Sequence, residues 1–177
     1  DKLAMEAGSN DMHAYSWLQS IMDIVEVWDD LIDGDKLVSH KDIHQTFINL
    51  MFFIPQNPFF ERHKTYLLPI ILTCVNAWMD ANELAKSENR RDKQAAWWLK
   101  QMGVELYGTV AFLTGGYNHM RDISLRARSI LAHEDFEDFD DAEDGGGNGN
   151  TINATGGSED LFMFTGMDAE EAQFVKD

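Results

Sequence analysis

The sequence predicts an all-α protein, a bundle of about five helices followed by an extended, acidic and Gly-rich C-terminal arm. Apolar residues recur at helical spacing through most of residues 1–132. No segment of that part alternates strictly between apolar and polar residues, as a half-buried strand would, and turn-forming dipeptides are few before residue 140. With 177 residues, 44% of them apolar, the chain can bury one core.

Charge divides the chain into a body and an arm. The whole chain has 31 acidic and 14 basic residues, a net charge of −17. Residues 133–177 hold 14 acidic residues and one lysine, a net of −13, so residues 1–132 keep 17 acidic and 13 basic residues, a net of −4. We therefore predict a helical body over 1–132 and an arm over 133–177. The negative electrostatic field of such a chain argues against direct nucleic-acid binding and against docking on an anionic membrane.

The first predicted helix runs to about Ile32. Ser9, Asn10 and Asp11 offer N-caps, and Asp33-Gly34-Asp35 ends the helix. Its apolar residues follow a 4-3-4-3 spacing along a wide face, which indicates a central helix: Trp17, Ile21, Ile24, Trp28 and Leu31.

A second helix is expected from His40 to about Phe53. Ser39 and Asp42 form a candidate capping box before it, and Pro55 and Pro58 predict a turn after it. A short helix near Phe59–His63 is expected to follow that turn.

A longer helix is expected from Tyr66 to about Ser87, with Pro69 tolerated in its first turn. The stretch from Tyr66 to Met79 is too short to span a membrane and is typical of a buried core helix. Cys74, the only cysteine, lies within it and is expected to be a buried, inert thiol.

Two more helices complete the predicted body. One covers about Asp92 to Leu113, with Gly103 and Gly108 allowing close helix packing. Gly115-Gly116 breaks the pattern, and a last helix runs from Tyr117 to about His133. In the helix over Asp92–Leu113, the residues expected to be buried are Trp97, Trp98, Leu99, Met102, Leu106, Val110 and Leu113. The last helix carries the apolar residues Ile123, Leu125, Ile130 and Leu131 and the arginines Arg121, Arg126 and Arg128.

The arm has an acidic run, a Gly/Asn linker and an apolar end. Residues 134–144 carry like charges, and residues 145–158 have the composition of a flexible linker. The apolar end, residues 161–174, is a predicted docking segment for another chain, although packing on its own body is the alternative. Its partner-binding candidates are Leu161, Phe162, Met163, Phe164 and Phe174.

Asp29, Asp30 and Asp33 form an acidic cluster at the end of the first helix. Their spacing of three and four places them on one flank, where like charges repel each other and oppose the helix dipole. Arginines of the last helix, a partner chain or a divalent cation would each offset this cost. The spacing does not fit an EF-hand. His40 and His44 are four apart, but Lys41 stands where a metalloprotease helix needs Glu and no Cys partner accompanies them, so two exposed histidines are expected.

This D-D-x-x-D pattern resembles the aspartate-rich signature of isoprenoid diphosphate synthases and terpene cyclases, which are also all-helical. The resemblance implies that Asp29, Asp30 and Asp33 hold Mg²⁺ ions that bind a diphosphate. Those families have a larger helical body and a second metal-binding motif on a facing helix. The nearest candidate here, Asp80 to Glu83, has the wrong spacing.

Adjacent aromatic pairs point to interfaces. Neighbours on a helix lie about 100° apart, so one member of each pair either faces a partner chain or lies in a helix buried on two sides. The pairs are Phe52-Phe53, Phe59-Phe60 and Trp97-Trp98.

The whole layout, a small helical body with a long arm, resembles the small helical virion proteins of tailed bacteriophages. The run Trp28 to Asp35 and the residues Asn57 to Phe60 are similar to proteins of such phages. The resemblance implies a non-enzymatic structural protein of the virion, for example at the head–tail connection. It would be present in several copies, bind other protein subunits and need no cofactor. It would be assembled in the host cytoplasm.

The alternatives are a cytoplasmic Mg²⁺-dependent diphosphate enzyme, and an acidic decoy of a nucleic-acid-binding protein. The first residues show no signal-peptide pattern, and we expect no membrane association.

Overall fold

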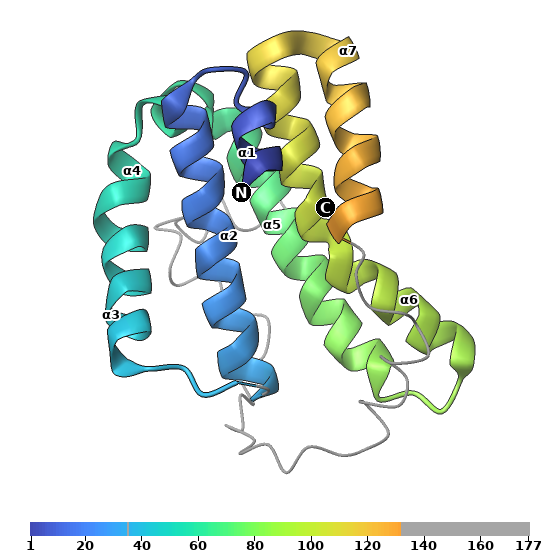
Figure 1. Cartoon of the computed structure of the whole chain (residues 1–177). Helices are drawn as coiled ribbons and strands as arrows, with labels where there is room; N and C mark the ends of the chain where they lie inside the picture. Colours follow the sequence, from blue (N-terminus) through green and yellow to red (C-terminus); the bar gives the residue numbers. More distant parts are fainter. Residues whose placement is uncertain (35, 132–177) are drawn as a thin grey trace, which may run out of the picture. The chain divides into compact units, whose positions relative to one another are not determined.

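The computed structural model describes residues 1–34 and 36–131, and every element in these ranges is helical (Figure 1), which confirms the all-α prediction. The predicted arm, 133–177, lies outside the described residues. The elements are α1 (Lys2–Ala7), α2 (Met12–Asp33), α3 (His40–Ile48), the π-helix η1 (Asn49–Phe53), α4 (Ile54–Gln56), α5 (Pro58–Ala85), α6 (Arg90–Lys100), the 3₁₀-helix η2 (Gln101–Val104) and α7 (Glu105–Leu131).

The central helix α2 begins and ends where its sequence signals predict. The Asp11 carboxylate accepts hydrogen bonds from the backbone N–H groups of His13 and Ala14, and Gly34 ends the helix in the left-handed conformation. The short α1 before it was not expected, because six residues are too few to show a helical period. Contacts with distant residues hold it instead, among them the Tyr107 hydroxyl, which donates to Asp1 over 2.6 Å.

The predicted capping box of Ser39 and Asp42 is present at the start of α3. The helix does not end near Phe53, however, but continues through the π-helical turns of η1 into α4 (Figure 1). Pro55 is accommodated near the start of α4, and the chain leaves the helical conformation only at Asn57.

The two helices expected over Phe59–Ser87 are one helix, α5, of 28 residues. Asn57 caps it by accepting hydrogen bonds from the backbone of Phe59 and Phe60, and Pro58 occupies the favourable first position. Pro69 therefore lies inside the helix, where it removes one backbone hydrogen bond at a cost of about 3 kcal/mol. Burial of residues on both sides of Pro69, such as Leu67 and Ala77, offsets that cost.

The helix expected over Asp92–Leu113 is divided into α6, η2 and the first half of α7. Trp98, predicted to be buried, is 60% exposed, because α6 packs only its other side on the end of α5. Ala81, Ala85 and Ala96 form a small buried cluster there.

The break predicted at Gly115-Gly116 is confirmed as a reversal of chain direction within α7 (Figure 1). Gly116 has φ 79° and ψ −170°, a conformation that only glycine adopts readily. The second half of α7 packs back on the first, and a Cβ at Gly108 would lie 3.3 Å from that of Ser124. Leu125 and Ile130 are exposed, because they lie on the outer side of this hairpin.

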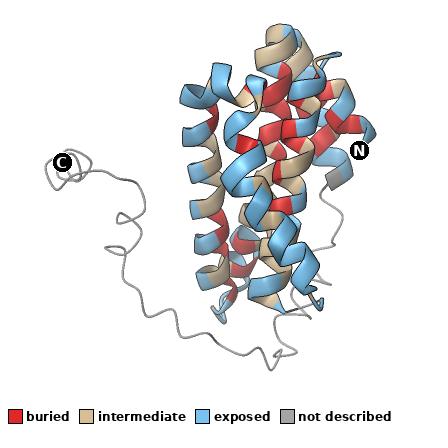
Figure 2. Cartoon of the chain, turned by 90° about the vertical axis from the view of Figure 1, so that its left-hand side faces the viewer, coloured by how far each residue is buried: buried red, intermediate tan, exposed pale blue. Residues whose placement is uncertain are grey.

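The main core lies between α2, the first half of α5 and α7, with α1 covering one end. Its largest fully buried side chains are Trp17, Phe59, Leu18, Leu67, Ile123 and Val110. Figure 2, viewed from the α3 side of Figure 1, shows buried residues gathered on the helices behind α3 and α4, which are mostly exposed. The α3–η1–α4 segment is therefore attached to the outside of the core.

Replacing Gly116 should destabilise the fold through the backbone alone. Gly116→Ala is expected to lower the free energy of unfolding by about 1–3 kcal/mol, since no atom would crowd the new Cβ and only its conformation is strained. Gly103→Ala is the matched control. Its Cβ would meet only Met22, at 3.9 Å, so we expect a change within about 1 kcal/mol. Urea unfolding measures the change in unfolding free energy for both substitutions. Equal changes would contradict the conclusion that the backbone conformation of residue 116 requires glycine.

Candidate interaction surface and aspartate cluster

A continuous uncharged surface covers the outside of the α3–η1–α4 segment. Of residues 40–56, only Ile54 is buried. No Asp, Glu, Lys or Arg occurs from Ile43 to Phe60. We call its exposed apolar residues the α3–α4 surface: Phe47, Ile48, Leu50, Met51, Phe52 and Phe53.

The α3–α4 surface faces away from the rest of the bundle. Thr46 and Asn49, which are half-buried, are the least exposed residues of α3 and η1 before Ile54. Phe47 and Met51, one helical turn apart, are 64% and 67% exposed. The rings of Phe52 and Phe53 pack edge to face against each other, with centroids 5.3 Å apart. Large aromatic and Met side chains without charged neighbours are typical of the core of a protein interface.

A second exposed apolar stripe runs along α5. The prediction that Tyr66–Met79 forms a buried core helix is correct for one side of the helix only. Leu67, Ala77 and Trp78 are buried, but Leu68, Leu72 and Met79 are close to half exposed or more. α5 contacts α2, α6 and α7 on its inner side, which leaves these residues on the outer side.

The aromatic pairs fall into three cases. Phe52 and Phe53 are both exposed. Phe59 and Phe60 both pack against Trp17, with ring centroids 6.0 and 6.2 Å away, so that pair belongs to the core. In the third pair, Trp97 is half-buried and Trp98 is exposed.

The docking residues predicted in the arm lie outside the described residues, so their prediction stays untested. They are Leu161, Phe162, Met163, Phe164 and Phe174.

The aspartates of the cluster each contact a different donor of the body. The Trp78 indole N–H donates to Asp29 over 2.8 Å, and the Lys100 ammonium lies 2.7 Å from Asp33. Asp30 lies 3.8 Å from Lys36, which also approaches Glu26 at 3.6 Å. The like charges at the end of α2 are thus partly neutralised by lysines.

Arg126 and Arg128 of α7, which were expected partners of this cluster, pair elsewhere. Arg126 contacts Glu6 of α1 and Asp122, and Arg128 binds Glu105 in a two-pronged arrangement at 2.7–2.8 Å. The reversal at Gly116 places this part of α7 beside α1 and the start of α7, so the arginines neutralise acids there.

Burial raises the pKa of the Asp29 carboxyl, and the nearby charge of Asp33 raises it further. The hydrogen bond from Trp78 and the charge of Lys100 act in the opposite direction but do not cancel this effect. The fold therefore opposes the ionisation of Asp29.

Metal-ligating residue types are dispersed in the described part of the chain. His40 and His44 are exposed on α3, and Cys74 is half-buried on α5, where its thiol donates to the Met102 carbonyl at 3.3 Å. Within residues 1–34 and 36–131, no three His, Cys, Asp or Glu side chains are grouped so as to hold a metal ion. None of the helices described there is long and apolar enough to cross a bilayer.

Comparisons of the chain with protein-family models, with curated proteins and with solved structures found no match.

Asp29→Asn should stabilise the protein increasingly as pH rises. Because the folded state raises the pKa of Asp29 above its ordinary value of 3.8, the stability linked to its proton is present below that value and is lost as pH rises through the folded value. An asparagine at position 29 keeps an oxygen that accepts the hydrogen bond from the Trp78 indole, but it cannot ionise.

The difference in unfolding free energy between Asp29→Asn and the wild type should thus increase from pH 3 to pH 7, measured by urea unfolding. Asp80→Asn, at an exposed position of α5, controls for the loss of one charge from the acidic chain. A difference that decreases with pH would mean that the fold favours the charged Asp29.

Proposed function

We propose that this chain is a non-enzymatic structural subunit of a larger protein assembly. Several copies would dock through the α3–α4 surface of the helical body and through the C-terminal arm. The observation that carries the proposal is the surface itself, whose six apolar side chains are each between 45% and 67% exposed without a charged residue among them. Monomeric proteins rarely expose a contiguous apolar patch of this kind without a function for it.

Net charge favours this surface as the contact between copies. A chain with a net charge of −17 repels a second copy over most orientations. The stretch from Ile43 to Phe60 carries no ionised side chain apart from any charge on His44, so two copies can meet there without bringing carboxylates together. Burial of Phe and Met on both sides would supply the favourable free energy, since large apolar side chains dominate interface energetics.

The resemblance to small helical virion proteins of tailed bacteriophages extends the proposal to a place in the virion, for example at the head–tail connection. The acidic arm, with its apolar end at Leu161–Phe164, supports that extension as a second docking element, because a short apolar segment at the end of a polar linker can reach a neighbouring subunit.

The Mg²⁺-dependent diphosphate enzyme stays an alternative prediction. Two of its proposed ligands, Asp29 and Asp33, already contact Trp78 and Lys100, so nothing in their geometry favours it over the structural role. Magnesium binding that Asp30→Asn abolishes would favour the enzyme.

Acidic substitutions on the α3–α4 surface should weaken self-association. The double variant Phe47→Glu and Met51→Glu is expected to raise the dissociation constant of the self-associated full chain by about 100-fold, if each residue contributes about 1.4 kcal/mol. Sedimentation velocity over a range of concentrations measures this.

The matched control is Tyr117→Glu with Leu125→Glu, two residues of α7 with similar exposure and the same charge change. A wild-type chain that stays monomeric at all concentrations, or equal weakening by both double variants, would contradict the proposed surface.

The C-terminal arm should contribute to self-association independently of the α3–α4 surface. Phe162→Ser with Phe164→Ser is expected to weaken self-association by about tenfold, the effect of about 1.4 kcal/mol, while Asn148→Ser with Asn150→Ser in the linker leaves it unchanged. The same sedimentation assay applies. Association that survives the phenylalanine substitutions intact would remove the arm from the proposal and leave the α3–α4 surface.

A further inference from the structure

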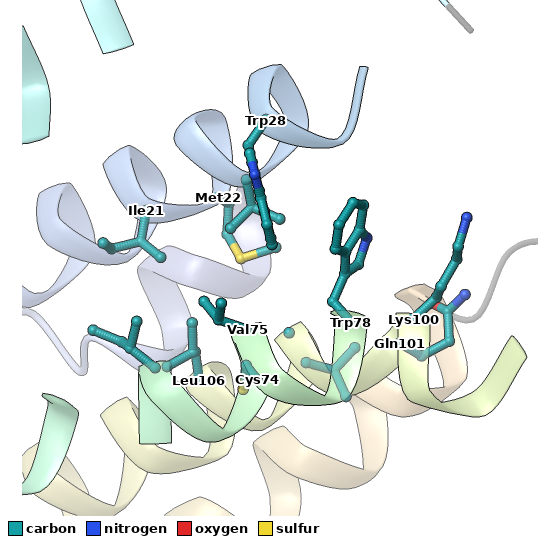
Figure 3. A pocket seen from close by; sticks show the side chains of 13 residues that line it. Ile21, Met22, Trp28, Cys74, Val75, Trp78, Lys100, Gln101 and Leu106 are labelled. Atoms are coloured by element: carbon teal, nitrogen blue, oxygen red, sulfur yellow. The ribbon is translucent and has the colours of Figure 1, made fainter. Parts of the chain in front are cut away.

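A cavity of about 210 Å³ lies between α2, α5 and the chain from Lys100 to Leu106. Figure 3 shows Trp28 and Trp78 at one end, with Lys100 and Gln101 beside Trp78, and Ile21 and Leu106 at the other end. The two indole rings come from different helices and contact each other, with centroids 4.2 Å apart. Most of the lining residues are half-buried, so the cavity is an open pocket at the edge of the core with a polar mouth.

The size and walls of the cavity suit an aromatic ring. A dry, apolar protein cavity of about 150 Å³ accepts benzene, so about 210 Å³ has room for a substituted ring or two fused rings. The walls are aliphatic and aromatic, with the Met22 thioether among them, and sulfur and indole both make favourable contacts with ring edges and faces.

The polar groups at the mouth indicate an uncharged ligand. Lys100 is held 2.7 Å from Asp33, so its charge is already neutralised. Asp29, which accepts from Trp78, adds negative charge nearby and disfavours an anion. The Gln101 side-chain amide makes no hydrogen bond within the described part of the chain, which leaves its two N–H donors and its carbonyl acceptor for a ligand.

We propose that this cavity binds one small, uncharged aromatic molecule of one or two rings that carries a single hydrogen-bonding group. Its ring would lie among Trp28, Met22 and Val75, and its polar group would reach Gln101 at the mouth. This site is separate from the α3–α4 surface and does not depend on the proposed role in an assembly.

The only cysteine of the chain offers a direct test, because Cys74 lines the cavity. Alkylation of the purified full chain by iodoacetamide, followed by intact mass, reports on this one position. With indole as the probe, at about ten times its dissociation constant, the alkylation rate should fall about tenfold, because the ligand occupies the space the reagent must enter. Benzoate, an anion of similar size, should give little protection.

A cysteine on the outer side of the same helix is the matched control. In Thr73→Cys with Cys74→Ser, the new thiol lies at an exposed position one residue away, so indole should leave its alkylation rate unchanged. In the wild type, a rate that stays unchanged up to the solubility limit of indole would overturn the proposal, and so would equal protection by benzoate.

Two variants locate the binding within the cavity. Val75→Phe should fill it and remove protection by indole. Gln101→Leu changes only the mouth and should weaken protection about fivefold or more while the rate without ligand stays the same. Circular dichroism checks that each variant is folded. If Val75→Phe does not fold, Gln101→Leu decides the question, and undiminished protection in a folded variant would overturn the assignment.

Discussion

The bundle depends on the burial of one side of α2. α1, α3, α5 and α7 all pack on this helix, and Trp17 at its centre has no exposed surface. The Trp17 indole N–H finds no hydrogen-bond partner in the described part of the chain, which costs about 1–3 kcal/mol. Burial of about 200 Å² of tryptophan surface contributes about 5 kcal/mol, so packing against Phe59 and Phe60 outweighs the unsatisfied donor. The positions of α1, α3, α5 and α7 follow from the part of the α2 surface that each of them covers.

Signals confined to one turn predicted the fold well, and signals that depend on distant neighbours did not. Asp11, Ser39 and Gly116 mark element boundaries because their effects are local: a cap, a capping box and a backbone conformation open to glycine. The prediction that a helix starts shortly before Pro69 was wrong, because tertiary packing offsets the cost of a proline inside the longer helix α5. The prediction that Leu72 is buried was wrong for another reason. The sequence pattern of an apolar helix side is the same whether that side packs on the protein's own core or is exposed.

The same distinction applies to the candidate sites. The sequence identified Asp29 and Asp33 as a cluster that needs positive partners, but it did not identify Lys100, which is 67 residues from Asp33 and is brought there by the turn from α5 into α6. The cavity beside Trp28 and Trp78 could not be predicted either, because each wall belongs to a helix whose own pattern indicates only a core. The run of uncharged residues from Ile43 to Phe60 was visible in the sequence, and it is the signal that could have identified the α3–α4 surface.

The pairing of α1 with α7 determines the order in which the bundle can form. Bonds such as those from Thr114 to Ala7 and from His119 to Glu6 join residues more than 100 positions apart. During synthesis on the ribosome, α1 and the side of α2 that packs on α7 therefore stay uncovered until α7 has emerged. A nascent chain with such distant contacts closes late and exposes apolar surface for longer, which favours help from chaperones at that stage. The acidic residues that follow α7 in sequence emerge after it and add negative charge at the stage when the uncovered apolar surface is prone to aggregate.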